Sequence, residues 1–233
     1  MDKQLVIFVA PPGAGKGTQA DLLAEKFGFV HVETSKLGEA KINDPGLVKK
    51  DPEVAEAKRL YDEGELFPSP WTTKLVVEKL EELAREGKGV VFSGSPRTVY
   101  EAEREMPEAD RLYGRDNIKI FCLSLSEEES VERNSERRIC EKNRHPIPRP
   151  EYDPKFANIT KCPWDGSPII TRPALDKPEI IRERYKVFLR DTAPVLDYFR
   201  NNGYKVVEVN GEQPIEKVFQ DILQYFPDDS NKN

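Results

Sequence analysis

One stretch near the start of the chain has the residue types and spacing of a phosphate-binding loop. It reads FVAPPGAGKGTQADLL and holds three glycines that leave the backbone free to wrap a phosphate, Gly13, Gly15 and Gly17. The helix that follows adds N–H donors and a favourable dipole. Lys16 would reach the β- and γ-phosphates of a nucleotide, and Thr18 would join the shell of Mg2+. A plain glycine-rich turn is the alternative, but strand, loop, lysine and helix occur in the order that phosphate binding requires.

A second candidate is Arg97, which ends the stretch VVFSGSPR. The apolar run predicts a buried strand, and Gly-Ser-Pro then breaks it. The arginine therefore falls just beyond the carboxyl end of a strand, where open parallel sheets bind their ligands. A guanidinium grips phosphate through two hydrogen bonds and stays charged. The pattern thus places a side chain that is well suited to phosphate at the expected ligand edge of the sheet, and leaves open what Arg97 binds.

Four potential metal ligands lie in a proline-rich segment. Cys140, His145, Cys162 and Asp165 have the spacing C-x4-H-x16-C-x2-D. Two short-spaced pairs separated by a long loop are typical of structural zinc sites. Zinc would also supply folding energy to a segment with little core. The alternative is a metal-free segment held by hydrogen bonds. The third cysteine, Cys122, is expected to be a buried apolar residue instead.

Five short apolar runs must form the sheet that positions these residues: 5–10, 29–33, 89–94, 118–125 and 204–210. Most are continuously apolar, as in strands covered on both faces. Helical patterns alternate with them, and this alternation predicts an α/β fold with a parallel, doubly wound sheet. His31 is expected to be a structural residue of its strand.

Residues that are typical of helix ends predict where the helices begin and end. Gly28 is expected to end the first helix. In a second helix, Ser69 is the expected N-cap, Pro70 the first helical residue and Gly87 the stop. Pro178 is expected to begin another.

Two segments interrupt the alternation. Residues 34–67 are polar, rich in Lys and Glu, and expected to be helical, whereas residues 139–178 hold eight of the 19 prolines and should contain little helix. Long insertions of this kind in a compact domain are usually binding loops or lids.

The overall composition excludes several classes of protein. The 233 residues are 37% hydrophobic and 33% charged, with a formal net charge of −6. This composition is typical of a soluble globular protein and unfavourable for sequence-independent nucleic-acid binding. No apolar run is long enough to cross a membrane, and the N-terminus shows no secretory signal. Three cysteines favour a reducing, cytoplasmic environment.

Taken together, these motifs resemble the adenylate kinase family of nucleoside monophosphate kinases, over residues of about 4 to 225. The matching segments are PPGAGKGTQA, VHVETSKL, GELFPSP, SGSPRT, ERNSERR and RYKVFLRDTAPVLDYF. The resemblance implies a P-loop NTPase fold, with a five-stranded parallel sheet flanked by helices. It implies a core at 1–33, 68–134 and 173–233, an acceptor-binding insertion at 34–67 and a lid at 135–172.

The implied reaction is reversible transfer of the γ-phosphoryl group of MgATP to a nucleoside monophosphate, AMP by default. The implied partners are these two nucleotides, with no nucleic acid or membrane, and the implied state is a monomer. By the resemblance the catalytic residues are Lys16, Arg97, Arg137, Arg172 and Arg184. The ATP site would comprise Gly13, Ala14, Gly15, Lys16, Gly17, Thr18, Gln213 and Arg133, which would stack on adenine. The acceptor site would comprise Thr34, Leu66, Phe67, Gly94, Arg97 and Glu101. Some relatives hold zinc in the lid, as Cys140, His145, Cys162 and Asp165 would here.

The acceptor site departs from the family pattern at four positions. Glu39 stands where the family has its phosphate-binding arginine, and Lys36, Lys41, Lys58 and Arg59 are the candidate substitutes. Glu101 replaces the glutamine that reads adenine. An ionised carboxylate only accepts hydrogen bonds, which suits a base edge with two donors, such as guanine. Ser93 replaces the acid that orders the Mg2+ hydration shell, and Ser95 replaces an aromatic residue.

These departures leave three hypotheses open. The protein is an AMP kinase, a kinase for GMP or another monophosphate, or a weakly catalytic nucleotide-binding regulator. Lys16 and the full set of arginines favour an active enzyme. A P-loop GTPase is a weaker alternative, because the sequence has no guanine-reading Asn-Lys-x-Asp motif.

Overall fold

The computed structural model describes residues 3–63, 65–143, 145–147, 149–150, 154–172 and 176–226. Its main feature is a five-stranded parallel sheet with the strand order β2-β3-β1-β4-β8. The strands are β1 (Leu5–Val9), β2 (Val30–Val32), β3 (Val90–Phe92), β4 (Ile118–Ser124) and β8 (Val206–Asn210). All five lie inside the apolar runs, so the predicted α/β fold and its strands are confirmed. Every residue of β1 is buried, as expected for a central strand covered on both faces.

The chain divides into two compact units. The first contains residues 1–9, 20–122 and 190–207, and the second contains residues 10–19, 123–189 and 208–233. In the described part of the first unit, β1 pairs in parallel with β3 and with β4, and β2 pairs in parallel with β3. The carboxyl ends of these strands therefore share one edge, where ligands bind in sheets of this type.

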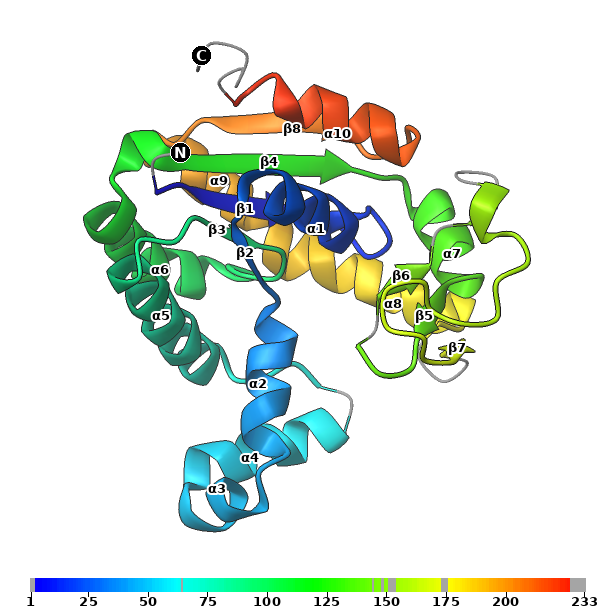
Figure 1. Cartoon of the computed structure of the whole chain (residues 1–233). Helices are drawn as coiled ribbons and strands as arrows, with labels where there is room; N and C mark the ends of the chain where they lie inside the picture. Colours follow the sequence, from blue (N-terminus) through cyan, green and yellow to red (C-terminus); the bar gives the residue numbers. More distant parts are fainter. Residues whose placement is uncertain are drawn as a thin grey trace. The chain divides into compact units, whose positions relative to one another are not determined.

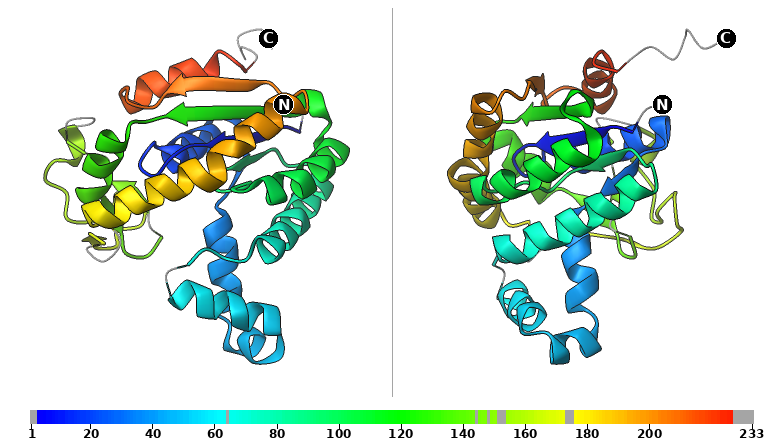
Figure 2. Two further views of the ribbon diagram at one scale, coloured as in Figure 1. Left: turned by 180° about the vertical axis from the view of Figure 1, so that it is seen from behind. Right: turned by 90° about the vertical axis from the view of Figure 1, so that its left-hand side faces the viewer.

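Helices cover both faces of the sheet in the first unit. They are residues 20–27 of α1 (Lys16–Phe27), α5 (Ser69–Arg85), α6 (Val99–Tyr113) and α9 (Ala193–Asn201). Helix α5 packs along α6, and α6 packs against α9. Helix α9 lies on the opposite face of the sheet from α1 (Figures 1 and 2). The short helix η1 (Arg115–Asn117) leads from α6 into β4.

Three helices in the first unit form a small cluster of their own, α2 (Thr34–Ile42), α3 (Pro45–Lys50) and α4 (Pro52–Asp62). The carboxylates of Asp44 and Asp51 cap α3 and α4 by accepting hydrogen bonds from backbone N–H groups. Ile42, Val54 and Ala57 pack with residues at the start of α5. The expectation of helices within residues 34–67 is confirmed.

The second unit contains α7 (Glu127–Ser135), α8 (Pro178–Val187) and α10 (Ile215–Leu223). Helix α7 packs against α8, and a three-stranded antiparallel sheet has the order β6-β5-β7. Its strands are β5 (Arg138–Cys140), β6 (Pro146–Ile147) and β7 (Ile169–Ile170), and a 3-10 turn, η2, covers Pro154–Phe156. A π-helical segment, η3 (Phe188–Thr192), connects α8 to α9. Within the described residues of 139–178, short strands and one turn replace regular helix, as the prolines predict.

The expected helix signals are confirmed at three positions and wrong at two. Gly28 and Gly87 follow α1 and α5 with positive φ angles of 68°, and Pro178 begins α8. Ser69 is not an N-cap and Pro70 is the second helical residue, because α5 begins at Ser69 itself and Pro68 precedes it. The hydroxyl of Ser69 instead donates to a carboxylate of α6, as described below. Cys122 is also less buried than expected, with intermediate exposure. No helix among the described residues is both long and apolar enough to cross a membrane.

Candidate functional site

The phosphate loop follows β1 directly and leads into α1. Gly13 and Gly15 have φ angles of 82° and 85°, which favour glycine. A side chain at Gly13 would also come within 2.5 Å of the amide of Asn134. The hydroxyl of Ser130 donates to the carbonyl of Pro12 over 2.7 Å. The loop is therefore held in its shape by its own glycines and by α7.

The side chain of Lys16 lies back over this loop. Its Nζ atom donates to the carbonyl oxygens of Ala10 and Pro11, over 2.7 and 3.0 Å. Helix α1 begins at Lys16, so Gly17 and Thr18 lie in its first turn, where backbone N–H groups have no partner within the helix. Ala14 precedes this turn and is buried. The loop thus presents a lysine, the backbone N–H groups of a helix N-terminus and a threonine hydroxyl, as an anion site requires.

Two residues predicted for the ATP site, Arg133 and Gln213, lie around the β8–α10 connection. Arg133 donates to the carbonyl oxygen of Gly211 over 2.8 Å and to Glu129 over 2.6 Å. Gln213 bonds to the carbonyl of Asn210 and to Asp221. The side chain of Arg133 therefore contacts the β8–α10 connection, which also contains Gln213, in the second unit.

Three of the predicted catalytic arginines converge on one buried carboxylate. Asp176 accepts hydrogen bonds from Arg137 over 2.7 Å and from two nitrogens of Arg172 over 3.1 and 3.2 Å. A nitrogen of Arg184 lies 4.0 Å from the same carboxylate. Burial raises the pKa of Asp176, while the charges of Arg172 and Arg184 lower it. The sequence analysis missed Asp176, since an acid near arginines is a common surface pattern.

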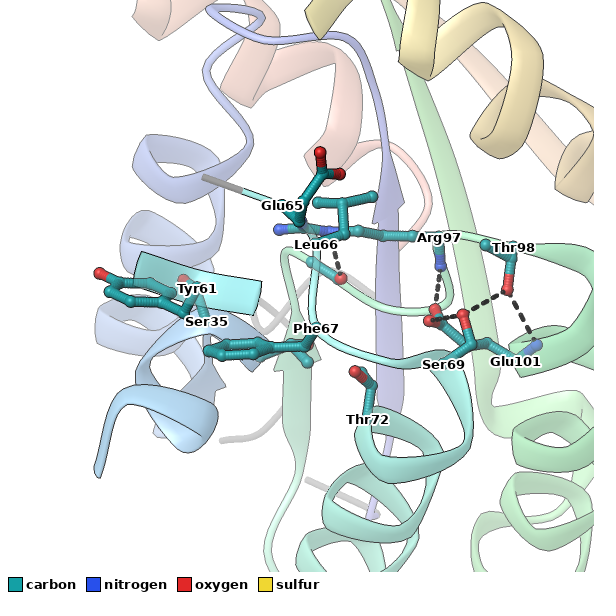
Figure 3. Close-up of a pocket in the computed structure, with 12 residues that line it drawn as sticks. Ser35, Tyr61, Glu65, Leu66, Phe67, Ser69, Thr72, Arg97, Thr98 and Glu101 are labelled. Carbon is teal, nitrogen blue, oxygen red and sulfur yellow. Dashed lines mark hydrogen bonds between the residues drawn. The ribbon is translucent and has the colours of Figure 1, made fainter. Parts of the chain in front are cut away.

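A cavity of about 150 Å3 lies beyond the carboxyl end of β3 in the first unit, as Figure 3 shows. Its lining residues are Thr34, Ser35, Tyr61, Glu65, Leu66, Phe67, Ser69, Thr72, Gly94, Arg97, Thr98 and Glu101. They include every residue predicted for the acceptor site. Among the described residues that line it, Arg97 is the single cation.

Thr34 and Gly94 form one wall of this cavity. The hydroxyl of Thr34 is buried and has no hydrogen-bond partner among the residues that the structure describes. Such a group costs free energy unless a ligand or water satisfies it. A Cβ atom at Gly94 would lie 3.4 Å from the guanidinium of Arg97 and 3.5 Å from the hydroxyl of Thr34, so Gly94 lies beside both groups. The cavity thus has an unsatisfied hydroxyl and a guanidinium on the same wall.

Glu101 fixes the loop that carries Arg97. Its two oxygens accept hydrogen bonds from the backbone N–H of Arg97 over 2.6 Å and from the hydroxyl of Ser69 over 2.9 Å. Figure 3 shows both bonds as dashed lines. The side chain of Arg97 donates in turn to the carbonyl of Gly94 over 2.9 Å. Burial lowers the pKa of the Arg97 guanidinium and the charge of Glu101 opposes this, so the group stays charged.

The aromatic side of the cavity includes Tyr61 and Phe67, whose rings stack with centroids 5.4 Å apart. The hydroxyl of Tyr61 donates to Glu39 over 3.1 Å. Glu39 does not line the cavity, and neither do the four candidate substitutes for the family's phosphate-binding arginine. Lys58 and Arg59 instead bond to carboxylates of their own helix.

The two serines that depart from the family pattern both have partners. Ser95 is buried and donates to both oxygens of Glu105 at 2.9 Å. Burial, together with the charge of Glu101, raises the pKa of Glu105 well above its ordinary value of 4.5. Ser93 lies 2.7 Å from the imidazole of His31. Both partners are distant in sequence, and no local pattern points to them.

The four predicted metal ligands come together in the second unit. The donor atoms of Cys140, His145, Cys162 and Asp165 all lie within 4.8 Å of one another. Nδ1 of His145 is 3.4 Å from the sulfur of Cys140, from the sulfur of Cys162 and from an oxygen of Asp165. Ligands placed about 2.0–2.3 Å from zinc in a tetrahedron are about 3.3–3.8 Å apart. The donor atoms therefore fit zinc in identity and spacing.

Neighbouring groups orient the carboxylate of the candidate ligand Asp165. One oxygen accepts hydrogen bonds from the N–H and hydroxyl of Ser167, and the other accepts one from Asn143 over 2.8 Å. The bonds from Ser167 hold the pKa of Asp165 below its ordinary value, so the group is ionised. Asn143, which stands at the usual ligand spacing, supports a ligand instead.

Magnesium also fits the donors that the chain offers. Mg2+ prefers oxygen ligands, keeps several waters and is usually bound through substrate phosphates. Thr18 offers such an oxygen, a hydroxyl in the first turn of α1. The residues present therefore suit a hydrated ion that the nucleotide phosphates largely hold.

The parallel sheet, the phosphate loop after its central strand and the arginines define a P-loop phosphotransferase. The sequence model of the adenylate kinase family matches residues 8–204. An adenylate kinase of Petrotoga mobilis is 35% identical over 94% of this chain and 95% of its own length. Adenylate kinases of Archaeoglobus fulgidus and Chloroherpeton thalassium are 35% and 36% identical over 93% of this chain and 95% of their own lengths. The chain belongs to the adenylate kinase family and is a nucleoside monophosphate kinase.

Proposed function

We propose that the protein transfers the γ-phosphoryl group of MgATP reversibly to AMP, giving two ADP. The observation that carries this proposal is the cavity beside Arg97, with the unsatisfied hydroxyl of Thr34 on the same wall. A base-sized cavity next to a partly buried arginine suits a nucleoside monophosphate. The relatives named adenylate kinase support AMP as the acceptor.

The donor nucleotide is expected at the phosphate loop. Backbone N–H groups of residues 13–18 and the Nζ atom of Lys16 would bind the phosphates of ATP. To do so, Lys16 leaves the carbonyls of Ala10 and Pro11, which it contacts now. Arg133 and Gln213 would contact the adenosine part. Magnesium bound with ATP would neutralise part of the phosphate charge.

The acceptor is expected in the cavity of the first unit. Arg97 would bind its phosphate, and Leu66, Phe67 and Glu101 would surround its base. Phosphoryl transfer requires positioning and charge stabilisation rather than a covalent partner in the protein. Arg137, Arg172 and Arg184 would supply the charge around the transferred group, since each can exchange the carboxylate of Asp176 for a phosphate oxygen.

GMP is the second candidate acceptor because of the geometry at Glu101. Its carboxylate accepts hydrogen bonds from Arg97 and Ser69 and keeps further lone pairs for the base. Guanine presents two adjacent N–H donors, whereas adenine presents one donor and one acceptor. The carboxylate of Glu101 therefore favours guanine as the acceptor base, whereas the relatives named adenylate kinase favour adenine.

Three further features belong to this proposal. The segment 34–67 is the acceptor-binding part, 135–172 the lid, and 1–33, 68–134 and 173–233 the core. The cluster of α2–α4 and the sheet of β5–β7 support the two insertions. Cys140, His145, Cys162 and Asp165 hold a structural zinc ion. The protein is a monomer. Its cysteines form no disulfide within the described part of the chain, which suits the reducing cytoplasm.

The test is a coupled assay of phosphoryl transfer from ATP to AMP, GMP, CMP and UMP, with Arg97→Met as the inactive control. Highest kcat/KM with AMP supports the proposal, and highest kcat/KM with GMP supports the second candidate. ATP binding without turnover of any acceptor would overturn both and leave a nucleotide-binding regulator.

A further inference from the structure

A buried serine in the loop that carries Arg97 is hydrogen-bonded to a buried glutamate of α6. Ser95 lies in this loop, between β3 and α6, and Glu105 lies within α6. The two residues are almost inaccessible to solvent, with exposed fractions of 2% and 3%. The hydroxyl oxygen of Ser95 lies 2.9 Å from each carboxyl oxygen of Glu105. The pair therefore connects the loop to the interior of the first unit.

The two equal distances suit a neutral carboxylic acid at Glu105. A hydroxyl has one proton, so Ser95 cannot make a full hydrogen bond to both oxygens of an ionised carboxylate. A protonated carboxyl satisfies both contacts, because its carbonyl oxygen accepts from Ser95 while its own O–H donates to the Ser95 oxygen. Each group then has a donor and an acceptor, and this reciprocal pair fixes both side chains.

The surroundings of Glu105 also favour its neutral form. A small space of about 10 Å3 beside it is lined from β1, α5, β3 and α6. Apart from Ser95 and Glu105, the side chains that line this space are apolar: Leu5, Ile7, Val76, Leu80, Phe92, Pro96, Met106 and Ala109. The negative charge of Glu101, one turn earlier on α6, adds to the effect of burial, and both raise the pKa of Glu105.

The loop that this pair holds also contributes to the acceptor cavity. Gly94 precedes Ser95, Arg97 follows it two residues later, and both line the cavity. The side chain of Arg97 donates to the carbonyl of Gly94 over 2.9 Å, and its backbone N–H donates to Glu101 over 2.6 Å. Successive turns of α6 therefore fix one loop, through Glu101 on Arg97 and through Glu105 on Ser95.

We propose that Glu105, through its hydrogen bonds with Ser95, positions Arg97 to bind the phosphate group of the acceptor nucleotide. The inference rests on the proposed function and deepens it. Glu105 is a positioning residue, since the described lining of the cavity includes neither it nor Ser95. A guanidinium binds phosphate well only when its nitrogens face the phosphate oxygens, so a small shift of the loop weakens binding. The pair orders the loop before the acceptor binds, which reduces the entropy lost on binding.

The alternative is that the pair only satisfies two buried polar groups and stabilises the fold. Loss of the pair would then lower stability and leave the affinity for the acceptor unchanged. The phosphate group separates the two roles, because Arg97 is expected to bind the phosphate and not the base. Loss of positioning should therefore weaken binding of a nucleoside monophosphate more than binding of the corresponding nucleoside.

The test measures dissociation constants of the full chain for AMP and GMP by calorimetry, and for adenosine and guanosine by NMR titration. We expect Glu105→Leu and Ser95→Ala to raise the dissociation constant of the monophosphate about threefold to tenfold, the worth of one hydrogen bond, and to leave nucleoside binding unchanged. Glu105→Gln should retain the affinity, because an amide also offers the Ser95 hydroxyl one acceptor and one donor. Glu103→Gln, at an exposed position on the same helix, is the control and should change neither constant.

Two results would overturn the inference and leave the proposed function intact. One is an unaltered affinity for AMP and GMP in both Glu105→Leu and Ser95→Ala, with only a lower melting temperature. The other is an equal loss of affinity for monophosphates and nucleosides, which would indicate a general change in the fold. Absence of AMP and GMP binding to the unaltered protein would overturn the acceptor site itself, and the inference with it.

Discussion

Arg137 donates a hydrogen bond of 2.7 Å to Asp176, 39 residues further along the chain, and the same carboxylate receives Arg172. Asp176 is nearly buried and has the guanidinium of Arg184 beside it. Three cations this close together would repel one another without an anion between them. The carboxylate therefore keeps the arginines assembled in this structure, and under the proposed function a phosphate group would take its place.

The first prediction concerns the variant Asp176→Asn. A neutral amide cannot balance three guanidiniums, so the arginines should separate and kcat should fall about tenfold or more. The free energy of unfolding should fall by roughly 1–3 kcal/mol, since Arg137 and Arg172 are partly exposed. Steady-state kinetics and urea denaturation measure the two effects. Asp197→Asn, at an exposed pair with Arg200, should change neither. An unaltered kcat in Asp176→Asn would contradict the assembling role.

The second prediction concerns base selection by Glu101. Glu101→Gln keeps one oxygen for the N–H of Arg97 and places an amide NH2 next to the hydroxyl of Ser69. The new side chain can donate to the base, so the ratio of kcat/KM for AMP to that for GMP should rise about tenfold or more. Initial rates with both acceptors give this ratio.

Glu65→Gln is the matched control for Glu101→Gln, because it removes the same charge from the lining of the same cavity. It should change kcat/KM for both acceptors alike. An equal ratio in Glu101→Gln and the unaltered protein would show that Glu101 only fixes the loop.

Structural features formed by residues that are close together in the sequence are the ones that the sequence predicts best. The phosphate loop needs only its glycines, Lys16 and the following helix, and both cysteines of the candidate zinc site belong to short-spaced pairs. Contacts across the fold could not be predicted in the same way. Ser69 has the residue type of an N-cap, but its partner Glu101 is 32 residues away and on another helix. The pairing of Ser93 with His31, 62 residues apart, depends on the order of the strands.

The third prediction concerns the candidate zinc centre. The purified protein should contain about one zinc ion per chain, and Cys162→Ser should lose it, because thiolate is the preferred ligand here. A chelator should lower the melting temperature by several degrees, since the segment has little core to replace the metal. Elemental analysis and thermal unfolding test both statements. Cys122→Ser, outside the cluster, should retain zinc. A zinc content below a tenth of an equivalent would contradict the proposal.

The last prediction concerns Glu105 and the pH dependence of stability. Burial raises the pKa of Glu105 well above 4.5 in the folded protein. In the unfolded chain the group loses its proton above about pH 4.5, while the folded protein retains it. The unfolded state then binds fewer protons, so the free energy of unfolding falls as pH rises from about 4.5 towards the folded pKa.

Glu105→Gln removes this titration and can still bond to Ser95, so its stability relative to the unaltered protein should increase as pH rises from about 5 to 8. Each unit of pKa shift corresponds to about 1.4 kcal/mol. Urea denaturation across this pH range measures the difference. Glu103→Gln, at an exposed position on the same helix, should give a difference that does not change with pH. If the difference in unfolding free energy between Glu105→Gln and the unaltered protein were also independent of pH, Glu105 would be ionised in the folded protein. Ser95 would then be donating to a buried charge.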